Sequence, residues 1–569
     1  MSGTSSQIAD RQLAGDLTGR AALPARPVRA RRKARVRRAF PLAALVIAGV
    51  VALPVCLVAA NLLVPRGEVW AHLAATLLPE LVLNTVLLLA GVGVGVSVLG
   101  TGLAWLVATR RFPGRDLFDW ALILPLAMPA YVIGFVFVGV FEFSGPLQTA
   151  LRSLFGAGFR LPEIRSYGGV VAVMTLVFYP YVYLLARTAF GEQRLTLLEA
   201  ARSLGETPRG AFFRVALPLA RPAIAAGAAL ALMETLADFG TVATFGYRTF
   251  TTAIYRVWFG MFDRVAAGQL AAVLMVAAAG LIVAERRARG RARFTQTHGR
   301  ALAAELPRLT GWRAAAATGA CALVLLTAFV LPTGVLVAWS LEAWAAGRVA
   351  STYPQLVTRS LGLSAVTAVV AVTAALVLAY GIRMAPTRLL QGAVRVAALG
   401  YAVPGSVVAV GVLLVLAGLD HAIGAAAGRI AGVSTGLLLT GSAAGLVFAY
   451  LVRFVSVSFQ AAESGLARVA PSMDEVARSL GAGPGRTLRE VHLPLVSGAL
   501  LTGLILVFVE VMKEMPATML IRPFGMDTLA VEVWQRTTES LWQEAALPAL
   551  TIVAVGVLPV VLLTRLRRR

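Results

Sequence analysis

Long uninterrupted runs of apolar side chains constrain this chain more than any other feature of its sequence. The runs are roughly 18 to 25 residues long, the length that a helix needs to cross about 30 Å of hydrocarbon. Lipid offers no partners to backbone N–H and C=O groups, so such runs must be helical. We therefore predict an all-α integral membrane protein with about 12 transmembrane helices. The predicted spans are 40–64, 81–109, 120–142, 168–190, 223–245, 265–285, 313–340, 359–382, 394–418, 434–457, 497–515 and 545–564.

The composition agrees with a membrane protein, since 58% of the residues are hydrophobic and only 14% are charged. The formal net charge of +24 raises the question of nucleic-acid binding. The basic residues, however, form short clusters between the apolar runs, as residues that set membrane topology do. We expect contact with the lipid bilayer and no nucleic-acid partner.

The basic clusters also predict the orientation of the chain. They follow spans two and eight, fill the linker between spans six and seven, and occupy both ends of the sequence, whereas the loop 419–433 is poor in arginine. An even number of spans places all these clusters on one side, which the positive-inside rule makes cytoplasmic. Residues 1–39 then form a basic cytoplasmic tail, the run from residue 40 is an uncleaved first span, and both termini are cytoplasmic.

The sequence contains an internal repeat. Residues 199–218 and 475–494 share ten of twenty positions at a constant offset of 276 residues. We therefore predict two homologous six-helix halves, 40–285 and 313–569, joined by a basic cytoplasmic linker at 286–312.

Each repeat copy predicts a short helix, a tight turn and a second helix at the membrane surface. Gly205 and Gly481 suit the left-handed helix end that such a turn needs. Thr207 is a good N-cap for the following helix, and Pro208 suits its first turn. A single copy is explained equally well as an amphipathic surface helix without a partner. Two copies at matching places favour a docking element for a two-fold symmetric partner.

The repeat resembles the EAA loop of permeases of binding-protein-dependent ABC importers. The residues that match the motif are Glu199, Ala200, Ala201 and Gly205 in the first copy and Glu475, Ala477 and Gly481 in the second. The second copy departs from the motif at Val476, which keeps the position small and apolar. The resemblance implies a type I ABC importer-like permease in a bacterial inner membrane. It also implies a homodimer of ATP-binding subunits as ATPase-coupling partner, and a periplasmic substrate-binding protein.

A phosphate-binding P-loop requires a Gly-Lys-Ser/Thr sequence. The chain has only two lysines, Lys33 and Lys513, and neither follows a glycine. We therefore expect a transport permease and not an enzyme, with ATP and magnesium held by the partner ATPase and no cofactor in this chain. The cysteines and histidines show no metal-ligand spacing, so no metal site is predicted.

The segments 233–259 and 512–530 resemble the iron(III) importer permeases, a subfamily with fused halves. This resemblance implies iron(III) as cargo. Thiamine, another small anion or a polyamine remain alternatives within the importer class. Outside it, a proton-coupled secondary transporter also fits twelve spans in two halves, and an intramembrane enzyme is a more remote alternative.

Four acidic residues at membrane depth give an independent indication. Glu234 and Asp238 are four residues apart, which places them on one helical face, and Glu510 and Glu514 repeat this spacing in the second half. Buried ionisable groups are costly and usually face a water path. We predict that the four carboxylates surround a cationic translocation pathway suited to an oxygen-preferring ion such as iron(III). Alternatively, they only bond neighbouring helices or pair with Lys513.

Two further groups of residues carry weaker predictions. Pro129 and Pro404 are expected to kink spans three and nine. Three tyrosines in span four, Tyr179, Tyr181 and Tyr183, are expected to pack or anchor the helix more readily than to line a passage.

Overall fold

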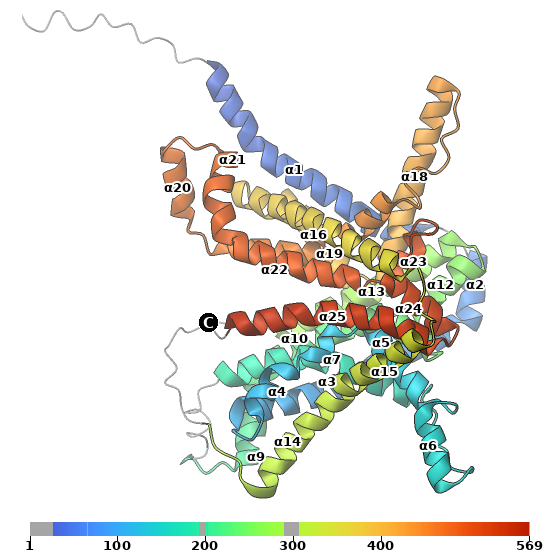
Figure 1. Ribbon diagram of the computed structural model, residues 1–569. Helices are drawn as coiled ribbons and strands as arrows, with labels where there is room; N and C mark the ends of the chain where they lie inside the picture. The colour runs from blue at the N-terminus through green and yellow to red at the C-terminus, as the bar shows by residue number, and fades with distance from the viewer. Residues whose placement is uncertain (1–26, 65–66, 193–200, 202, 290–305, 568–569) are drawn as a thin grey trace, which may run out of the picture.

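The computed structural model describes residues 27–64, 67–192, 201, 203–289 and 306–567 (Figure 1). Within these residues the chain is helical apart from loops and one isolated bridge between Arg111 and Arg308. Twelve helices are long and apolar enough to cross a membrane, which confirms the predicted all-α fold and the number of spans.

The long helices of the first half are α1 (Pro27–Ala60), α3 (Leu78–Thr109), α5 (Ala130–Phe141), α7 (Tyr167–Glu192), α10 (Leu217–Ala237) and α13 (Arg264–Arg289). Its short helices are α2 (Gly67–Thr76), α4 (Arg115–Ala121), α6 (Pro146–Phe155), α9 (Pro208–Ala211), α11 (Gly240–Thr244) and α12 (Phe250–Gly260). The long helices of the second half are α14 (Gly311–Leu325), α15 (Leu331–Ala345), α16 (Tyr353–Met384), α18 (Gly405–Ala431), α19 (Ala443–Ala467), α22 (Leu493–Met512) and α25 (Trp542–Arg567). Its short helices are α17 (Arg388–Ala397), α20 (Pro471–Ser479), α21 (Pro484–Thr487), α23 (Pro516–Ile521) and α24 (Leu529–Thr538).

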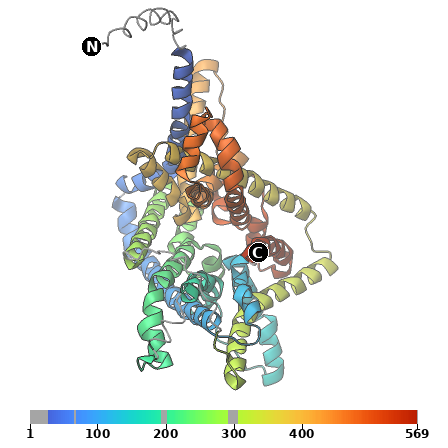
Figure 2. The ribbon, with the colours of Figure 1, turned by 90° about the vertical axis from the view of Figure 1, so that its left-hand side faces the viewer.

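Each half is built around three mutually packed helices, α3, α7 and α10 in the first half and α16, α19 and α22 in the second. An outer helix of each half lies against helices of the other half (Figure 2). Helix α1 packs on α16, α17 and α18, and α15 packs on α25 and contacts α5. At Gly411 of α18 an added Cβ would lie 2.5 Å from the carbonyl oxygen of Pro54 in α1, so the two backbones are nearly in contact. The two halves are therefore interlocked.

The two repeat copies lie at one end of the bundle, which we call the repeat end. The last helix, α25, finishes at this end, and α1 begins there (Figure 1). Arg111 pairs through its backbone with Pro307 and Leu309, so the loop after span two meets the end of the linker. The described basic clusters thus gather on one side, as the charge pattern predicts.

The prolines in spans three and nine do not kink a helix, so this prediction is wrong. Pro129 and Pro404 have extended backbones and immediately precede the first residues of α5 and α18. Span three is consequently divided into α4, a 3-10 turn over Leu124–Ala127, and α5. A proline at a helix start costs little, because its missing N–H would have no intrahelical partner there.

Three π-helical turns interrupt the helices at Phe212–Ala216, Leu326–Val330 and Leu488–His492. Each is followed directly by a Leu-Pro pair, and in each the leucine N–H bonds to the carbonyl five residues earlier. Proline lacks an N–H, and its ring collides with the carbonyl four residues before it. Widening the turn relieves that collision, so the Leu-Pro ending of each repeat copy produces a wide turn at the base of α10 or α22.

Candidate functional site

The four acidic residues of the predicted pathway lie where two spans break. Helix α10 ends at Ala237 and α22 ends at Met512, earlier than predicted. Asp238 and Glu514 therefore do not continue the helical faces of Glu234 and Glu510, and this part of the prediction is wrong. Both instead cap the next short helix: Asp238 accepts the N–H groups of Thr241 and Val242, and Glu514 accepts that of Ala517.

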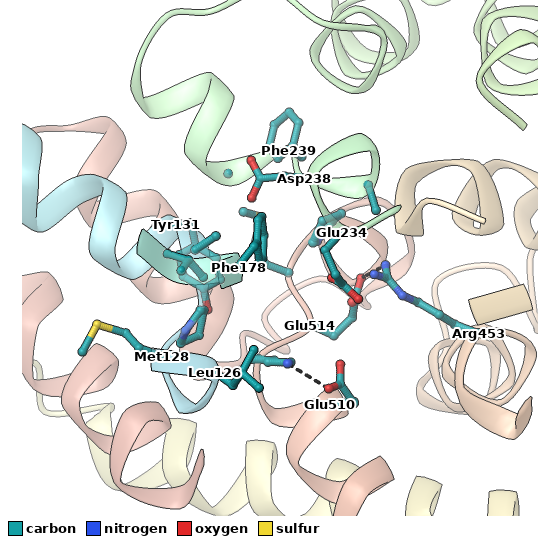
Figure 3. A pocket seen from close by; sticks show the side chains of 18 of the residues that line it. Leu126, Met128, Tyr131, Phe178, Glu234, Asp238, Phe239, Arg453, Glu510 and Glu514 are labelled. Atoms are coloured by element: carbon teal, nitrogen blue, oxygen red, sulfur yellow. Dashed lines mark hydrogen bonds and ion pairs between the residues drawn. The ribbon is translucent and has the colours of Figure 1, made fainter. Parts of the chain in front are cut away.

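All four carboxylates nevertheless line one cavity of about 90 Å³ between the halves (Figure 3). The cavity is roomy enough for several water molecules, each of which needs about 10–15 Å³. The first half contributes residues from the start of α5, from α7 and from the end of α10. The second half contributes Arg453 of α19 and the end of α22. The structure thus brings together four residues that the repeat related only by sequence.

The cations of the cavity all come from the second half. Lys513 pairs with Glu510 at 2.8 Å, and Arg453 pairs with Glu514 at 3.0 Å. Glu234 accepts a hydrogen bond from the hydroxyl of Tyr401 at 3.1 Å. Among the described residues, neither Glu234 nor Asp238 has an ion-pair partner. The cavity therefore holds an excess of two carboxylates over cations, although the predicted alternative of pairing with Lys513 holds for Glu510.

Tyrosine hydroxyls add oxygen atoms to this polar lining. Tyr181 lines the cavity, interacts with Tyr401, and lies within electrostatic reach of Glu234 and Glu510. Tyr131 also lines it, and its hydroxyl is buried without a hydrogen-bond partner in the structure. Tyr179 and Tyr183 instead bond the carbonyls of Leu122 and Asp119. Span four therefore uses two tyrosines for packing, as predicted, and one to line the cavity.

Aromatic rings lie beside the cavity, and two of them belong to α12 and α24, at the end of the bundle opposite the repeat end (Figure 1). Phe239 lines the cavity and stacks on Tyr255 of α12 at 4.0 Å, and Trp534 of α24 lies 5.1 Å from Phe239. The hydroxyl of Tyr255 donates to the carbonyl of Pro516 in the second half. Rings from both halves thus meet beside the cavity.

The second copy of the repeat forms the predicted helix–turn–helix. Helix α20 ends at Ser479, Gly481 follows with a left-handed φ of 78°, and α21 comes next. In the first copy Gly205 has a φ of 92°, and Thr207 caps α9 by accepting the N–H of Gly210 at 3.0 Å. The turn chemistry predicted from the sequence is confirmed at all three residues.

The two turns present equivalent apolar side chains to the outside. Leu204 is 86% exposed and Leu480 is 80% exposed. Ala201 and Ala477 are buried against the bundle, and Glu475 is exposed. Glu199 and Ala200 lie outside the described residues. Leu204 and Leu480 occupy equivalent positions in the two repeat copies. Two equivalent exposed leucines form the kind of surface that a symmetric partner covers.

Sequence reasoning missed several polar residues of these sites. Arg453 lies within span ten, so the rule that flagged the four acids would also have flagged it. Tyr401 gave no such signal, because it enters the cavity from a 3-10 turn over Ala398–Ala402 that the sequence does not predict. Arg383 belongs to the basic cluster after span eight, for which the sequence predicts a role in topology alone. In the structure it makes an ion pair with Asp474 of α20.

Comparison with known sequences gives a direct family match. The family described as "Binding-protein-dependent transport system inner membrane component" matches residues 100–284 and 360–569. The matched segments include both repeat copies and all four acidic residues of the cavity.

Individual relatives are similar over different extents. The Fe(3+)-transport system permease protein FbpB 2 of Haemophilus influenzae is 27% identical over 526 residues, covering 90% of this chain and 96% of the relative. The sulfate transport system permease protein CysT of Salmonella typhimurium is 31% identical over 186 residues, 32% of this chain and 65% of the relative. The molybdenum transport system permease protein ModB of Escherichia coli is 33% identical over 146 residues, 26% of this chain and 62% of the relative.

Proposed function

We propose that this chain, which belongs to the family of binding-protein-dependent inner-membrane permeases, carries iron(III). Family membership makes it the permease component of an ABC importer, and not a proton-coupled carrier or an enzyme. The observation that carries the proposal is the cavity between the halves, where carboxylates outnumber cations. The Fe(3+)-transport permease, similar along nearly its whole length, supports it.

The family implies an ATPase and a binding protein as partners in general. We propose that a homodimer of ATP-binding subunits, which holds the ATP and magnesium, docks on the two repeat copies. The exposed Leu204 and Leu480 then enter equivalent clefts of the two subunits. The coupling residues are Glu199, Ala200, Ala201 and Gly205 in the first copy and Glu475, Ala477 and Gly481 in the second. This arrangement requires the repeat end, and with it both termini, to be cytoplasmic.

Cargo delivered by a periplasmic binding protein would reach the cavity from the side on which Phe239, Tyr255 and Trp534 lie. Glu234, Asp238, Glu510 and Glu514 then offer the hard oxygen atoms that iron(III) prefers. Lys513 and Arg453 pair with two of these carboxylates and would compete with a bound cation for them. Their competition favours release over tight retention, as a passage requires.

The same two cations favour a second candidate, an oxyanion importer. Lys513 and Arg453 provide charged donors that suit a small anion, and the sulfate and molybdenum permeases match parts of the chain. In that case the uncompensated acids would hinder transport rather than assist it. The two functions therefore predict opposite effects when the acids are neutralised.

Uptake into proteoliposomes separates the two functions. The chain is reconstituted with its ATPase and binding protein, and ATP-driven uptake of iron(III), sulfate and molybdate is measured in separate assays. We expect iron(III) uptake, and a loss of about tenfold or more in Glu234→Gln combined with Glu510→Gln, because each removes a buried charge. Glu142→Gln, which changes a carboxylate paired with Arg165 away from the cavity, is the matched control. Iron(III) uptake that survives the double substitution, or sulfate or molybdate uptake that it increases, contradicts the proposal.

A further inference from the structure

A buried polar cluster joins the second repeat copy to the membrane helices. Arg383, near the end of α16, donates from Nε to Oδ2 of Asp474 in α20 at 2.8 Å. Its other nitrogens donate to the carbonyls of Leu466 at 2.6 Å and Val469 at 2.9 Å. One guanidinium thus fixes α20 to α16 and to the end of α19. The pair is largely shielded, with 17% of the Arg383 side chain and 26% of the Asp474 side chain exposed.

The same carboxylate also holds the wide turn at the base of α22. Nε2 of His492 lies 2.6 Å from Oδ1 of Asp474, and the His492 side chain is fully buried. The ring of Tyr380 packs edge-on against His492 at 5.4 Å, and its hydroxyl donates to the carbonyl of Pro484 at 2.9 Å. His492 is the last residue of the π-helical turn, so the Leu-Pro pair that widens this turn also sets where the imidazole points.

The cluster has no sequence counterpart in the first repeat copy. At the 276-residue offset, Asp474 corresponds to Leu198 and His492 corresponds to Ala216. Neither leucine nor alanine carries a side-chain hydrogen-bonding group, so at these two positions the first copy has neither the carboxylate nor the imidazole of the second. The two docking elements are alike in their turns and exposed leucines, but they differ in sequence at the positions of Asp474 and His492.

We infer that Arg383, Asp474 and His492 are coupling residues, which make α20 and the base of α22 one rigid unit, so that movement of an ATPase subunit docked on the second repeat copy is transmitted to Glu510 through α22. The inference rests on the proposed docking of the ATPase at the repeat copies. A buried charge-assisted network with several bonds resists deformation more than apolar contacts do. Helix α22 runs from this cluster to the cavity without a break, since it is helical from Leu493 to Met512.

The test compares ATP hydrolysis with transport in the reconstituted complex. In His492→Ala, which introduces the residue of the first copy, we expect the ATPase to remain bound and active. Uptake per ATP hydrolysed should fall by about tenfold, because Asp474 loses a buried partner. His492→Gln, whose amide can donate to Asp474, should recover most of this ratio. Asp474→Asn provides a second variant that changes charge with little change in shape, and it should also lower the ratio.

Asp119→Asn is the matched control. Asp119 accepts two bonds of 2.6 Å from Arg187, with side-chain exposures of 28% and 24%, but this pair joins α4 to α7 and not the repeat copy. We expect it to leave uptake per ATP unchanged even where it lowers thermal stability. An unchanged ratio in both His492→Ala and Asp474→Asn, or an equal fall in Asp119→Asn, overturns the inference.

The docking proposal is tested separately by Leu204→Asp combined with Leu480→Asp, which should prevent the ATPase from copurifying. If the ATPase still copurifies with that variant, the docking proposal fails whatever the coupling ratio shows. If wild-type protein transports sulfate or molybdate instead of iron(III), the iron proposal fails. The coupling ratio is then measured with that anion.

Discussion

Gly405 shows how closely the buried charges of the cavity are fitted to the backbone around them. It begins α18, directly after Pro404, and an added Cβ would overlap the guanidinium of Arg453. The same Cβ would lie 2.7 Å from Oε1 of Glu514. The absence of a side chain at this residue is what permits the ion pair between α19 and the end of α22.

Gly405→Ala should therefore destabilise the protein by about 2 kcal/mol, within the range for overpacking a filled site. The measurement is the melting temperature in detergent, together with uptake in proteoliposomes. Gly418→Ala in the same helix is the control, since an added Cβ there meets nothing within 4 Å. Because alanine is the better helix former, the control should keep or raise the melting temperature. Equal melting temperatures for the two variants would contradict this account of the ion pair.

At the scale of the element, the Leu-Pro pairs explain why the repeat copies join their spans through wide turns. A regular α-helix through residue 494 would place the proline ring against a carbonyl. The π-helical turn avoids this contact and shifts the residues before it around the helix axis. His492 faces Asp474 as a result, since one residue in an α-helix corresponds to about 100° of rotation.

Pro494→Ala should restore a regular turn and rotate His492 away from Asp474. Uptake should then fall severalfold, whereas the melting temperature should not fall, because proline inside a helix costs up to about 3 kcal/mol. Uptake in proteoliposomes and thermal unfolding are the two measurements. Pro146→Ala, at the first turn of α6, is the control and should change neither quantity. A Pro494→Ala variant with normal uptake would show that the wide turn is not needed.

The sequence predicts the number and type of elements well, because a span has a required length and apolarity. Their interruptions were not predicted. The breaks after Ala237 and Met512 occur inside predicted spans, where Asp238 and Glu514 provide the caps for the next helix. Hydropathy does not report such capping. The turns at Gly205 and Gly481 were predicted, since a left-handed helix end has a direct residue preference.

For the whole molecule, the exchange of outer helices means that neither half is enclosed by its own chain segment. Phe40 of α1 packs edge-on against Tyr380 of α16 at 5.1 Å. Phe135 of α5 stacks on Trp339 and Trp542 of the second half at 6.4 and 6.3 Å. The interface is therefore a continuous apolar core and not a contact between two finished domains.

Cutting the chain between His298 and Gly299 should leave a complex that stays together. When residues 1–298 and 299–569 are produced as separate chains in one cell, we expect them to copurify in mild detergent. A first chain that starts at Gly67, and so lacks α1, should copurify much less, because α1 contacts α16, α17 and α18. Separate elution of the two intact pieces would contradict the interlocked arrangement.

The two halves of this permease give its passage an asymmetric distribution of charge. A transporter made from two identical chains must place every charge twice, once on each side of its symmetry axis. Lys513 would then face a second lysine, and four carboxylates would meet at least two ammonium groups of like sign. Here the residue that corresponds to Lys513 at the repeat offset is Ala237, so only one half carries the ammonium group. The cavity therefore has unpaired carboxylates on the wall from the first half and ion-paired carboxylates on the wall from the second.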